Sequence, residues 1–276
     1  MSQKQPASSA ASKRPAILSI AGFDPTGGAG IITDAAVFRA LGFHPLTVLT
    51  SVAAQGASEV MQIRALPEVF IRRELQIVGR EFHPVAVKIG MLYSEPAVMA
   101  CADFLAEKQL PAVLDPLIWA SSGRSLLRAS AMRSLSQRLI PMCRLITPNL
   151  EEARYFLRMP ILNLSEAAHA ARWLARRWET WVLLKGGHLP GPPVDILTDG
   201  DQVRRYSHAR IADGINLRGT GCALSAAAAV GLAQGKSVVE AVEFALEFLH
   251  KAIRTYYLAA QSKSVGYLHF PAKKAR

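Results

Sequence analysis

Residues 16–41 read AILSIAGFDPTGGAGIITDAAVFRAL, and their order of elements decides the fold. The β-rich apolar run Ala16–Ala21 predicts a strand, and the segment from about Ile31 to Leu41 predicts a helix. The loop between them carries Gly27, Gly28 and Gly30, which allow a backbone to approach a ligand closely. The sequence therefore predicts a strand, a ligand-binding loop and a helix in direct succession.

This loop matches neither of the common nucleotide-binding signatures. Its glycines do not follow the G-x-G-x-x-G spacing of dinucleotide-binding folds, and the chain holds no G-x-x-x-x-G-K-[S/T] P-loop. Asp34 follows about one turn after Gly30, where a carboxylate either accepts hydrogen bonds from a ligand or complements the helix dipole. The residues alone leave both roles of Asp34 open.

The same alternation of strand and helix continues outward along the chain. Further strands are predicted at 45–51, 85–89, 112–114, 144–147 and 181–185, and helices at 67–80, 94–108, 126–139, 165–177 (capped by Ser165), 220–234 and 237–259. A hairpin is predicted around Asp199-Gly200-Asp201. Such alternation is typical of a largely parallel sheet covered on both faces by helices. We therefore expect one α/β domain over residues 15–260, a flexible N-terminal tail over 1–14 and a C-terminal tail over 261–276.

Composition and charge exclude several function classes. Half of the 276 residues are apolar, enough for a large core, and no apolar run is long enough to span a bilayer. Cys101, Cys143 and Cys222 show no metal-ligand spacing, which favours a reducing cytoplasm over disulfides or structural zinc, and we expect the first two in the core. The net charge of +11 comes from scattered arginines, which favours attraction of anionic cofactors over nucleic-acid binding.

Unusual residues gather where the predicted strands end. They are Gly22–Gly30, Gln55, Gly90-Met91, Asp115, Asn149–Glu152 and Lys185–His188. Ligands of parallel sheets bind beyond the carboxyl ends of the strands, so we expect these residues to lie around one site.

Gly219-Thr220-Gly221-Cys222 leads straight into the alanine-rich segment Ala223–Ala233. A helix that starts here directs unpaired N–H groups and the positive end of its dipole at the glycines, an arrangement that suits a phosphate. The same dipole is expected to lower the pKa of Cys222. An ordinary helix start with a buried cysteine explains the four residues equally well.

Asn149 and Glu152 form an Asn-x-x-Glu pair at a predicted helix start. Capping alone is the more common explanation of this pattern. Their side-chain oxygens also suit the water shell of Mg²⁺. Asp115 and Lys185, each at a strand end, are candidates for the same metal and phosphate region, although Lys185 alone is ambiguous.

In order, the motifs resemble those of the hydroxymethylpyrimidine/phosphomethylpyrimidine kinases of thiamine biosynthesis, in the ribokinase-like superfamily. The matching stretches are Ile20–Gly30, Thr50–Gln55, Lys88–Met91, Leu114–Pro116, Ile146–Ala153, Leu184–His188 and Gly219–Cys222. The resemblance implies a three-layer α/β/α sandwich with a mostly parallel central sheet and a homodimer or higher oligomer, whereas the expectation of no membrane or nucleic-acid partner comes from composition and charge. It also implies phosphoryl transfer from Mg-ATP to 4-amino-5-hydroxymethyl-2-methylpyrimidine and then to its monophosphate.

The resemblance also implies a role for each matching residue. It assigns pyrimidine binding to Gly22, Asp34, Gln55 and Met91; the anion hole to Gly219, Thr220 and Gly221, with Cys222 as the base; ATP-phosphate contacts to Asp115 and Lys185; and a water-mediated Mg²⁺ site to Asn149 and Glu152. Cys222 takes the place of the aspartate base of the related sugar and pyridoxal kinases.

The chain departs from the family pattern near the substrate. Phe23, Thr26 and Gly56 replace commoner residues, and Leu217-Arg218 stands where a Thr-His pair is common. Arg218 precedes the anion hole directly, so we hypothesise that it contacts the transferring or substrate phosphate; a solvated arginine is the alternative. Two other functions stay open: a pyridoxal/pyridoxine kinase and a non-catalytic pyrimidine sensor on the same fold.

Overall fold

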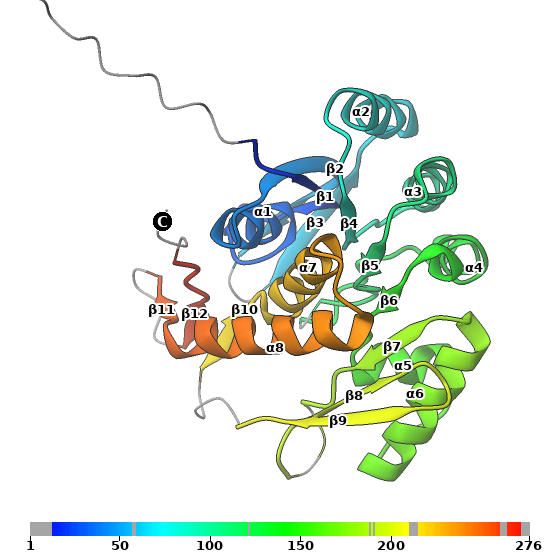
Figure 1. The fold of residues 1–276 in the computed structure, drawn as a ribbon, viewed down its shortest axis with the longest axis vertical. Coiled ribbons are helices and arrows are strands. Elements are labelled where there is room, and N and C mark those ends of the chain that lie inside the picture. Colours follow the sequence, from blue (N-terminus) through cyan, green and yellow to red (C-terminus); the bar gives the residue numbers. More distant parts are fainter. Residues whose placement is uncertain are drawn as a thin grey trace, which may run out of the picture.

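The computed structural model describes residues 13–56, 59–120, 122–187, 189, 191–209, 215–259 and 264–271 (Figure 1). A nine-stranded sheet runs through its middle in the order β3-β2-β1-β4-β5-β6-β7-β8-β9. Its strands are β1 (Ala16–Phe23), β2 (His44–Gln55), β3 (Val60–Ala65), β4 (Ala86–Ile89), β5 (Ala112–Leu114), β6 (Leu145–Ile146), β7 (Trp181–Leu184), β8 (Val194–Thr198) and β9 (Val203–Ser207). The six central strands run parallel to one another; they are β2, β1, β4, β5, β6 and β7. At the two edges, β3 pairs antiparallel with β2, β8 with β7, and β9 with β8.

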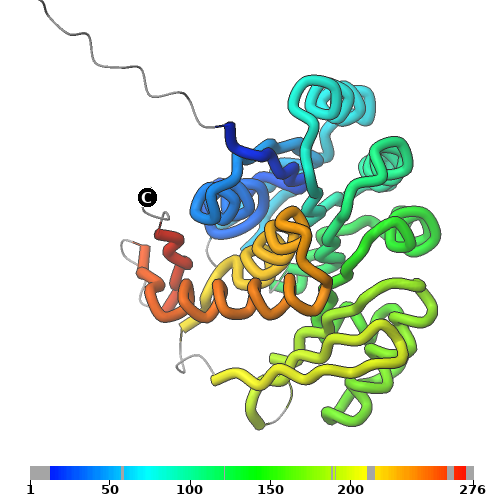
Figure 2. Tube along the Cα trace, viewed as in Figure 1, coloured from blue at the N-terminus to red at the C-terminus, as the bar shows by residue number. Residues whose placement is uncertain are grey.

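Helices cover both faces of this sheet, so the molecule has three layers (Figures 1 and 2). One face carries α1 (Gly30–Ala40), α7 (Thr220–Ala233) and α8 (Val238–Arg254). The other carries α2 (Glu68–Glu81), α3 (Glu95–Lys108), α4 (Ala131–Ser134), α5 (Leu150–Leu157) and α6 (Leu164–Trp178). The predicted α/β/α sandwich with a mostly parallel sheet is confirmed.

Sequence patterns explain these layers. The four residues of β4 are all buried, as expected for a central strand covered on both faces. Helix α7 is apolar on all sides, and it lies buried between the sheet and α8. Cys101 and Cys143 are free and buried, as predicted. No helix in the described part of the chain combines the length and the apolar character needed to cross a bilayer.

Two predicted helix starts differ from the structure. The helix expected at 126–139 begins only at Ala131, because the backbone amides of Leu126 and Arg128 donate to the Ile118 and Tyr93 carbonyls. It continues as a π turn (Leu135–Leu139) and a 3-10 turn (Ile140–Met142). Helix α6 is capped by Asn163, whose side chain accepts from the Glu166 amide, and Ser165 lies inside the helix.

The C-terminal region also differs from the expected tail over 261–276. Residues Val265–Tyr267 form β12, which pairs with β10 (Asn216–Arg218) and β11 (Tyr257–Leu258) in a second, three-stranded sheet. Tyr267 and Leu268 are buried. Figure 2 shows this red segment beside α8 and near the blue α1. The N-terminal tail predicted at 1–14 lies mostly outside the described residues.

The sheet order places the candidate residues together. The chain moves to opposite sides of β1 to form β2 and β4, so a crevice is expected beyond the carboxyl ends of these neighbouring strands. The loops that follow β1, β4, β5, β6 and β7 hold Gly22–Gly30, Gly90-Met91, Asp115, Asn149 and Lys185. Strands that run in parallel thus bring the polar ends of distant segments to one edge.

Candidate active site

The two glycine-rich segments meet backbone to backbone. Gly219 caps α7 in a left-handed conformation with φ of 76°. A β-carbon on Gly219 would lie 2.1 Å from the carbonyl oxygen of Gly28, and one on Gly30 would lie 2.2 Å from that of Gly22. Only glycine satisfies both the torsion and the contact at these positions. The loop after β1 and the start of α7 therefore form one continuous surface.

Cys222 lies at the floor of this surface, in the first turn of α7. The side chain is buried, and the Gly30 amide donates to its sulfur. Burial raises the pKa of the Cys222 thiol; Asp34 and Asp115 add to this effect, and Lys88 opposes it. The expectation of a lowered pKa from the helix dipole is therefore wrong, because desolvation and two nearby carboxylates outweigh the helix N-terminus.

An ion pair lies fully buried beside Cys222. The Lys88 ammonium donates to Asp34 Oδ2 at 2.8 Å, and the Ser19 hydroxyl donates to the same oxygen at 2.6 Å. Burial opposes the charge of Lys88, but Asp34, Cys222 and Asp115 together raise its pKa, so it stays an ammonium. A charged side chain in the fully buried strand β4 needs such a partner.

Lys88 lies in one of the stretches that resemble the family, but no role was predicted for it. The signal was available, because a lysine in the middle of an apolar strand rarely lies in a core without a function or a partner. Asp34, predicted to contact the pyrimidine, is fully buried with Lys88, and its Oδ1 finds no partner within the described ranges. Its structural role is to hold Lys88; a pyrimidine contact stays a prediction.

A second cationic group lies on the other side of the α7 start. Lys185 Nζ donates to Asp115 Oδ1 at 2.8 Å, and the Thr147 hydroxyl donates to that oxygen at 3.2 Å. A β-carbon on Gly221 would lie 3.2 Å from Lys185 Nζ and 3.4 Å from Asp115 Oδ2. The structure therefore brings Asp115, Lys185 and the Gly219–Cys222 segment together.

Asn149 and Glu152 form a complete capping box at α5. The Asn149 side chain accepts from the Glu152 amide at 2.9 Å, and Glu152 Oε2 accepts from the Asn149 amide at 2.8 Å. Burial raises the pKa of Glu152 to about 7, with Asp115 adding to the effect and Lys185 opposing it. The predicted cap is confirmed, and it occupies only one of the two carboxylate oxygens.

Two buried carboxylate oxygens here have no hydrogen-bond partner among the residues described. They are Asp115 Oδ2 and Glu152 Oε1, although the Ile118 amide also lies close enough to the Glu152 carboxylate to lower its pKa slightly. Buried polar atoms without a partner are costly, so such atoms in a cleft indicate a missing ligand or water. No group of three or more His, Cys, Asp or Glu side chains in the described part holds the geometry of a direct metal site. Two free oxygens fit a magnesium ion that keeps most of its water.

Apolar and polar groups adjoin the β1 end of the site. A β-carbon on Gly22 would lie 2.7 Å from Met91 Cε and 3.0 Å from the Ser51 hydroxyl, so these three residues share one wall. Met91 belongs to a small apolar cluster with Ala53, Val60, Ile63 and Leu126. Gln55 ends β2, where it is half-buried and pairs with Val60. Ser51, whose buried hydroxyl has no partner in the described structure, was missed from the sequence.

Arg218 binds a carboxylate of the glycine loop. Its guanidinium lies 3.5 Å from Asp24 Oδ2, and the two side chains are 17% and 4% exposed, so Arg218 is not a solvated arginine. Asp24 Oδ1 accepts from the amide and hydroxyl of Thr26. Arg218 Nε has no partner in the residues described. The ion pair between Arg218 and Asp24 therefore connects β10 to the loop after β1.

A family model described as phosphomethylpyrimidine kinase matches residues 24–271. The chain belongs to the phosphomethylpyrimidine kinase family. A hydroxymethylpyrimidine/phosphomethylpyrimidine kinase of Streptomyces coelicolor is 39% identical over 239 residues, 87% of this chain and 88% of that protein. The family match makes the protein an ATP-using kinase.

Solved structures agree with this family. A phosphomethylpyrimidine kinase from Clostridium difficile 630 matches with a TM-score of 0.77 and 32% identity over 87% of this chain and all of that one. The ADP complex of a Bacillus subtilis pyridoxal kinase matches with a TM-score of 0.84 and 28% identity over 94% and 98% of the two chains. The phosphomethylpyrimidine kinase fold is therefore close to that of pyridoxal kinases.

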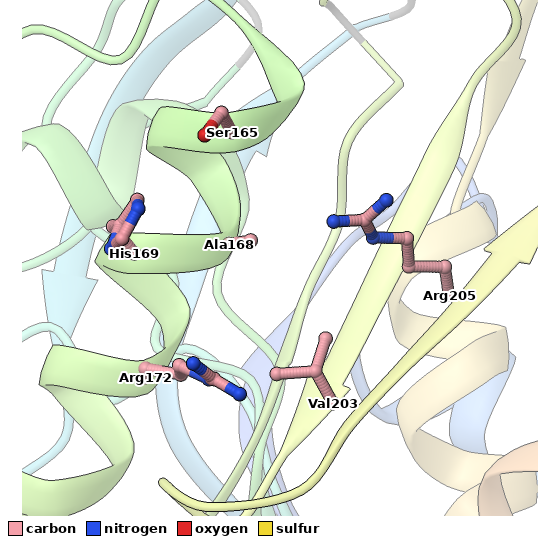
Figure 3. Close-up of a pocket in the computed structure, with 6 residues that line it drawn as sticks. All are labelled: Ser165, Ala168, His169, Arg172, Val203 and Arg205. Carbon is pink, nitrogen blue, oxygen red and sulfur yellow. The ribbon is translucent and has the colours of Figure 1, made fainter.

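A separate hollow lies away from this kinase site. It measures about 170 Å³ between α6 and β9, and Figure 3 shows its lining residues, Ser165, Ala168, His169, Arg172, Val203 and Arg205. Arg205 points from β9 toward the helix in that view. Arg172 already donates to the Asp201 carbonyl at 3.1 Å. None of the residues predicted for the phosphomethylpyrimidine kinase site lines this hollow.

Proposed function

We propose that this kinase phosphorylates 4-amino-5-hydroxymethyl-2-methylpyrimidine on its hydroxymethyl group and then phosphorylates the monophosphate, with ATP as the donor. The observation that carries the proposal is the placement of two ammonium groups, the fully buried Lys88 and the partly buried Lys185, close to Cys222 and the N-terminus of α7. A helix start with two fixed cations stabilises the charge that develops on a transferring phosphoryl group.

The roles along the reaction follow from position. The amides of Gly219, Thr220 and Gly221 hold the transferring phosphoryl group, and Lys185 contacts the ATP phosphates beside Asp115. Cys222 accepts the hydroxymethyl proton as a thiolate, which forms beside the Lys88 ammonium. Since burial raises the pKa of Cys222, only a small fraction of the enzyme holds that thiolate at neutral pH. Phosphoryl transfer tolerates this, because positioning and charge stabilisation supply most of the acceleration.

The acceptor pyrimidine lies over Gly22. Met91 contacts its flat ring through a polarisable thioether. Gln55 and Ser51 supply the donors and acceptors for the amino-pyrimidine edge. Asp34 accepts from the pyrimidine edge through Oδ1, which has no partner in the described structure, while its Oδ2 holds Lys88.

A magnesium ion fits at the α5 start. Glu152 Oε1 and Asp115 Oδ2, the two orphaned oxygens, hold its water shell together with Asn149. When bound, the ion neutralises charge on the ATP phosphates. Glu152 must then be ionised, which its raised pKa opposes until the cation is present.

Arg218 is assigned to the phosphate that distinguishes the second substrate from the first. Its Nε is free in the described structure, and its partner Asp24 lies 3.5 Å away, a long contact that a phosphate can replace. The free cysteines favour a reducing cytoplasm. A homodimer is also proposed, and apolar side chains exposed on α2, Val69, Phe70 and Ile77, support it.

One experiment tests the proposal against its alternatives. ADP release is measured with the hydroxymethylpyrimidine, its monophosphate and pyridoxine, each with wild type and Cys222→Ala. We expect the wild type to phosphorylate both pyrimidines and Cys222→Ala to do so much more slowly. Turnover of pyridoxine alone would favour a pyridoxal kinase, which the Bacillus subtilis structure makes the second candidate. No turnover of any acceptor, with tight pyrimidine binding, would favour a sensor.

A further inference from the structure

Three side chains outside the proposed site form a hydrogen-bonded row. His250 Nε2, on α8, lies 2.9 Å from His208 Nδ1, in the loop after β9. His208 Nε2 lies 3.0 Å from Asp195 Oδ2, on β8. The His208 and Asp195 side chains are only 12% and 11% exposed. The row therefore joins three elements across the edge of the sheet, largely shielded from water.

The carboxylate determines the direction of these bonds. An ionised Asp195 can only accept, so His208 carries its proton on Nε2. In the neutral ring, His208 Nδ1 is then an acceptor, and His250 Nε2 donates to it. The three groups thus form a relay in which each imidazole sets the tautomer of the next.

The other oxygen of Asp195 reaches the proposed site. Asp195 Oδ1 accepts from the Gly186 amide at 2.9 Å, and the Lys185 amide donates to the Pro148 carbonyl at 2.9 Å. Two consecutive amides are therefore fixed immediately around Lys185, the residue whose ammonium donates to Asp115. A rotation of the Asp195 carboxylate would release the second of them.

We propose that His208 and His250 are positioning residues for ATP: through Asp195 they fix the backbone at Gly186 and thereby the direction of the Lys185 side chain. This inference rests on the proposed contact between Lys185 and the ATP phosphates. It concerns residues that touch neither the pyrimidine nor the reacting atoms.

A merely structural link between α8 and the β8–β9 hairpin would give a different result. Loss of a structural link lowers stability and affects both substrates alike. Loss of a positioning relay weakens nucleotide binding and leaves the pyrimidine KM unchanged, because Gly22 and Met91 lie at the far end of the site. The affinity of folded variants for the nucleotide therefore distinguishes a structural link from a positioning relay.

The main test compares His250→Phe, which removes the donor, with His250→Gln, which keeps an amide donor near the same position. The dissociation constant of ADP is measured by calorimetry, and no acceptor substrate is needed. We expect about a threefold to tenfold weaker ADP binding for His250→Phe, the range that one lost hydrogen bond gives. His250→Gln should stay near wild type, and so should His169→Phe, the control on α6.

The imidazole nitrogens give a second readout. In ¹⁵N spectra of wild type, His208 should appear as the Nε2–H tautomer, with Nδ1 accepting a hydrogen bond. In His250→Phe, the Nδ1 signal should move to that of a free acceptor nitrogen. A folded His250→Phe with wild-type ADP affinity would overturn the proposal, as would equal losses in ADP affinity and pyrimidine KM.

The pH dependence of ADP binding is the third readout. The groups facing His250 are Asp195 from β8, His208 after β9 and Arg254 on its own helix, and burial with His208 and Arg254 lowers the pKa of His250. When one extra proton binds, the His208 and His250 rings can still share a hydrogen bond between Nδ1 and Nε2. When a second proton binds, both facing nitrogens carry a hydrogen and the bond breaks. Wild-type affinity should therefore fall at acidic pH, and His250→Phe should lose that step; an identical pH profile would count against the relay.

These outcomes stay distinct from those of the proposed function. If no pyrimidine is phosphorylated but ADP binding responds to His250→Phe and not to His250→Gln, the relay holds and the substrate assignment fails. If the pyrimidines are phosphorylated and the dissociation constant of ADP is unchanged in His250→Phe, only the relay is excluded.

Discussion

The Lys88 ammonium lies 2.8 Å from Asp34 Oδ2, and neither side chain has any surface exposed to solvent. This buried pair joins β4 to α1 close enough to Cys222 that both charges act on the pKa of the thiol. A charge in such a place needs its partner, since neither group can reach water. Each member of the pair therefore compensates the buried charge of the other, and together they set the potential at the thiol.

Removal of both members of this pair should cost less than the two single removals added together. Lys88→Met leaves the Asp34 carboxylate uncompensated, and we expect the free energy of unfolding to fall by about 3–5 kcal/mol. The double variant Lys88→Met/Asp34→Leu should lose less than the sum of the two single variants. Guanidinium unfolding of all three measures this, and additive losses would show that the two groups act independently.

The thiol of Cys222 should give the enzyme an alkaline pH profile. Burial raises the pKa of Cys222 above its ordinary value of 9.0, so the thiolate fraction keeps growing as the pH rises past neutrality. We expect kcat to increase with pH up to the limit of stability, and Cys222→Ala to lower kcat by about 100-fold and flatten this slope. Cys143→Ala, which removes a buried thiol elsewhere, is the control. An unchanged slope in Cys222→Ala would exclude the thiol as the base.

Glu152 should couple magnesium binding to pH. Its pKa of about 7 lies above the ordinary 4.5, so the fold loses stability as the pH rises through this interval and the buried carboxyl ionises. Glu152→Gln keeps the cap acceptor without the charge. We expect it to raise the melting temperature at pH 8 relative to wild type, to leave it similar at pH 5, and to raise the magnesium concentration needed for half-maximal rate.

Proton release gives an independent check of the same residue. Magnesium binding at pH 6.5 should release a proton from wild type, because the cation favours the ionised carboxyl. Calorimetry in buffers of different ionisation enthalpy measures that proton. A proton released equally by Glu152→Gln would assign it to another group.

Gly219 and Gly235 form a matched pair for testing the close approach of the two loops. Both have positive φ, 76° and 77°, but a β-carbon on Gly219 would meet Gly28 O at 2.1 Å, whereas one on Gly235 meets nothing within 4 Å. Both Ala variants carry the cost of backbone strain, about 1 kcal/mol. Only Gly219→Ala should also abolish turnover in a folded protein. Comparable activity of the two variants would exclude the contact as a requirement.

Arg218 should separate the two phosphorylation steps. Arg218→His, which introduces the residue that the family resemblance predicts at this position, should lower kcat/KM for the monophosphate by about tenfold and change the alcohol little, since only one substrate carries the phosphate. Asp24→Asn breaks the 3.5 Å ion pair and keeps the cation, so it should spare the monophosphate. Equal effects of both variants on both substrates would assign the pair to loop stability alone.

Much of the fold was accessible from the sequence because its signals are local. The strand, loop and helix of residues 16–41 and the capping box at Asn149 depend on near neighbours, and both were predicted. The edge strand β3 and the strands β10 to β12 were missed, since short exposed strands carry little hydrophobic periodicity.

The sequence indicated which strand-end motifs would lie together, but it did not indicate the roles of Lys88 and Ser51 or the electrostatics of the site. The order of strand-end motifs brought Asp115, Lys185 and Gly219–Cys222 to one place. The pKa of Cys222 depends instead on burial and on Asp34, Asp115 and Lys88, which lie far away in the sequence. The Asp24–Arg218 pair is likewise a tertiary contact that no local pattern indicates.

The glycine loop depends on Tyr267, a residue that is synthesised long after the loop itself. A β-carbon on Gly28 would lie 2.8 Å from the Tyr267 ring, and β12 pairs Tyr267 with Arg218. The loop belongs to the first strand–helix unit, yet its wall comes from residues near the opposite end of the described chain. A nascent chain on the ribosome therefore cannot complete the wall of this loop before residue 267 emerges, and we expect a protein shortened ahead of β12 to leave the loop uncovered.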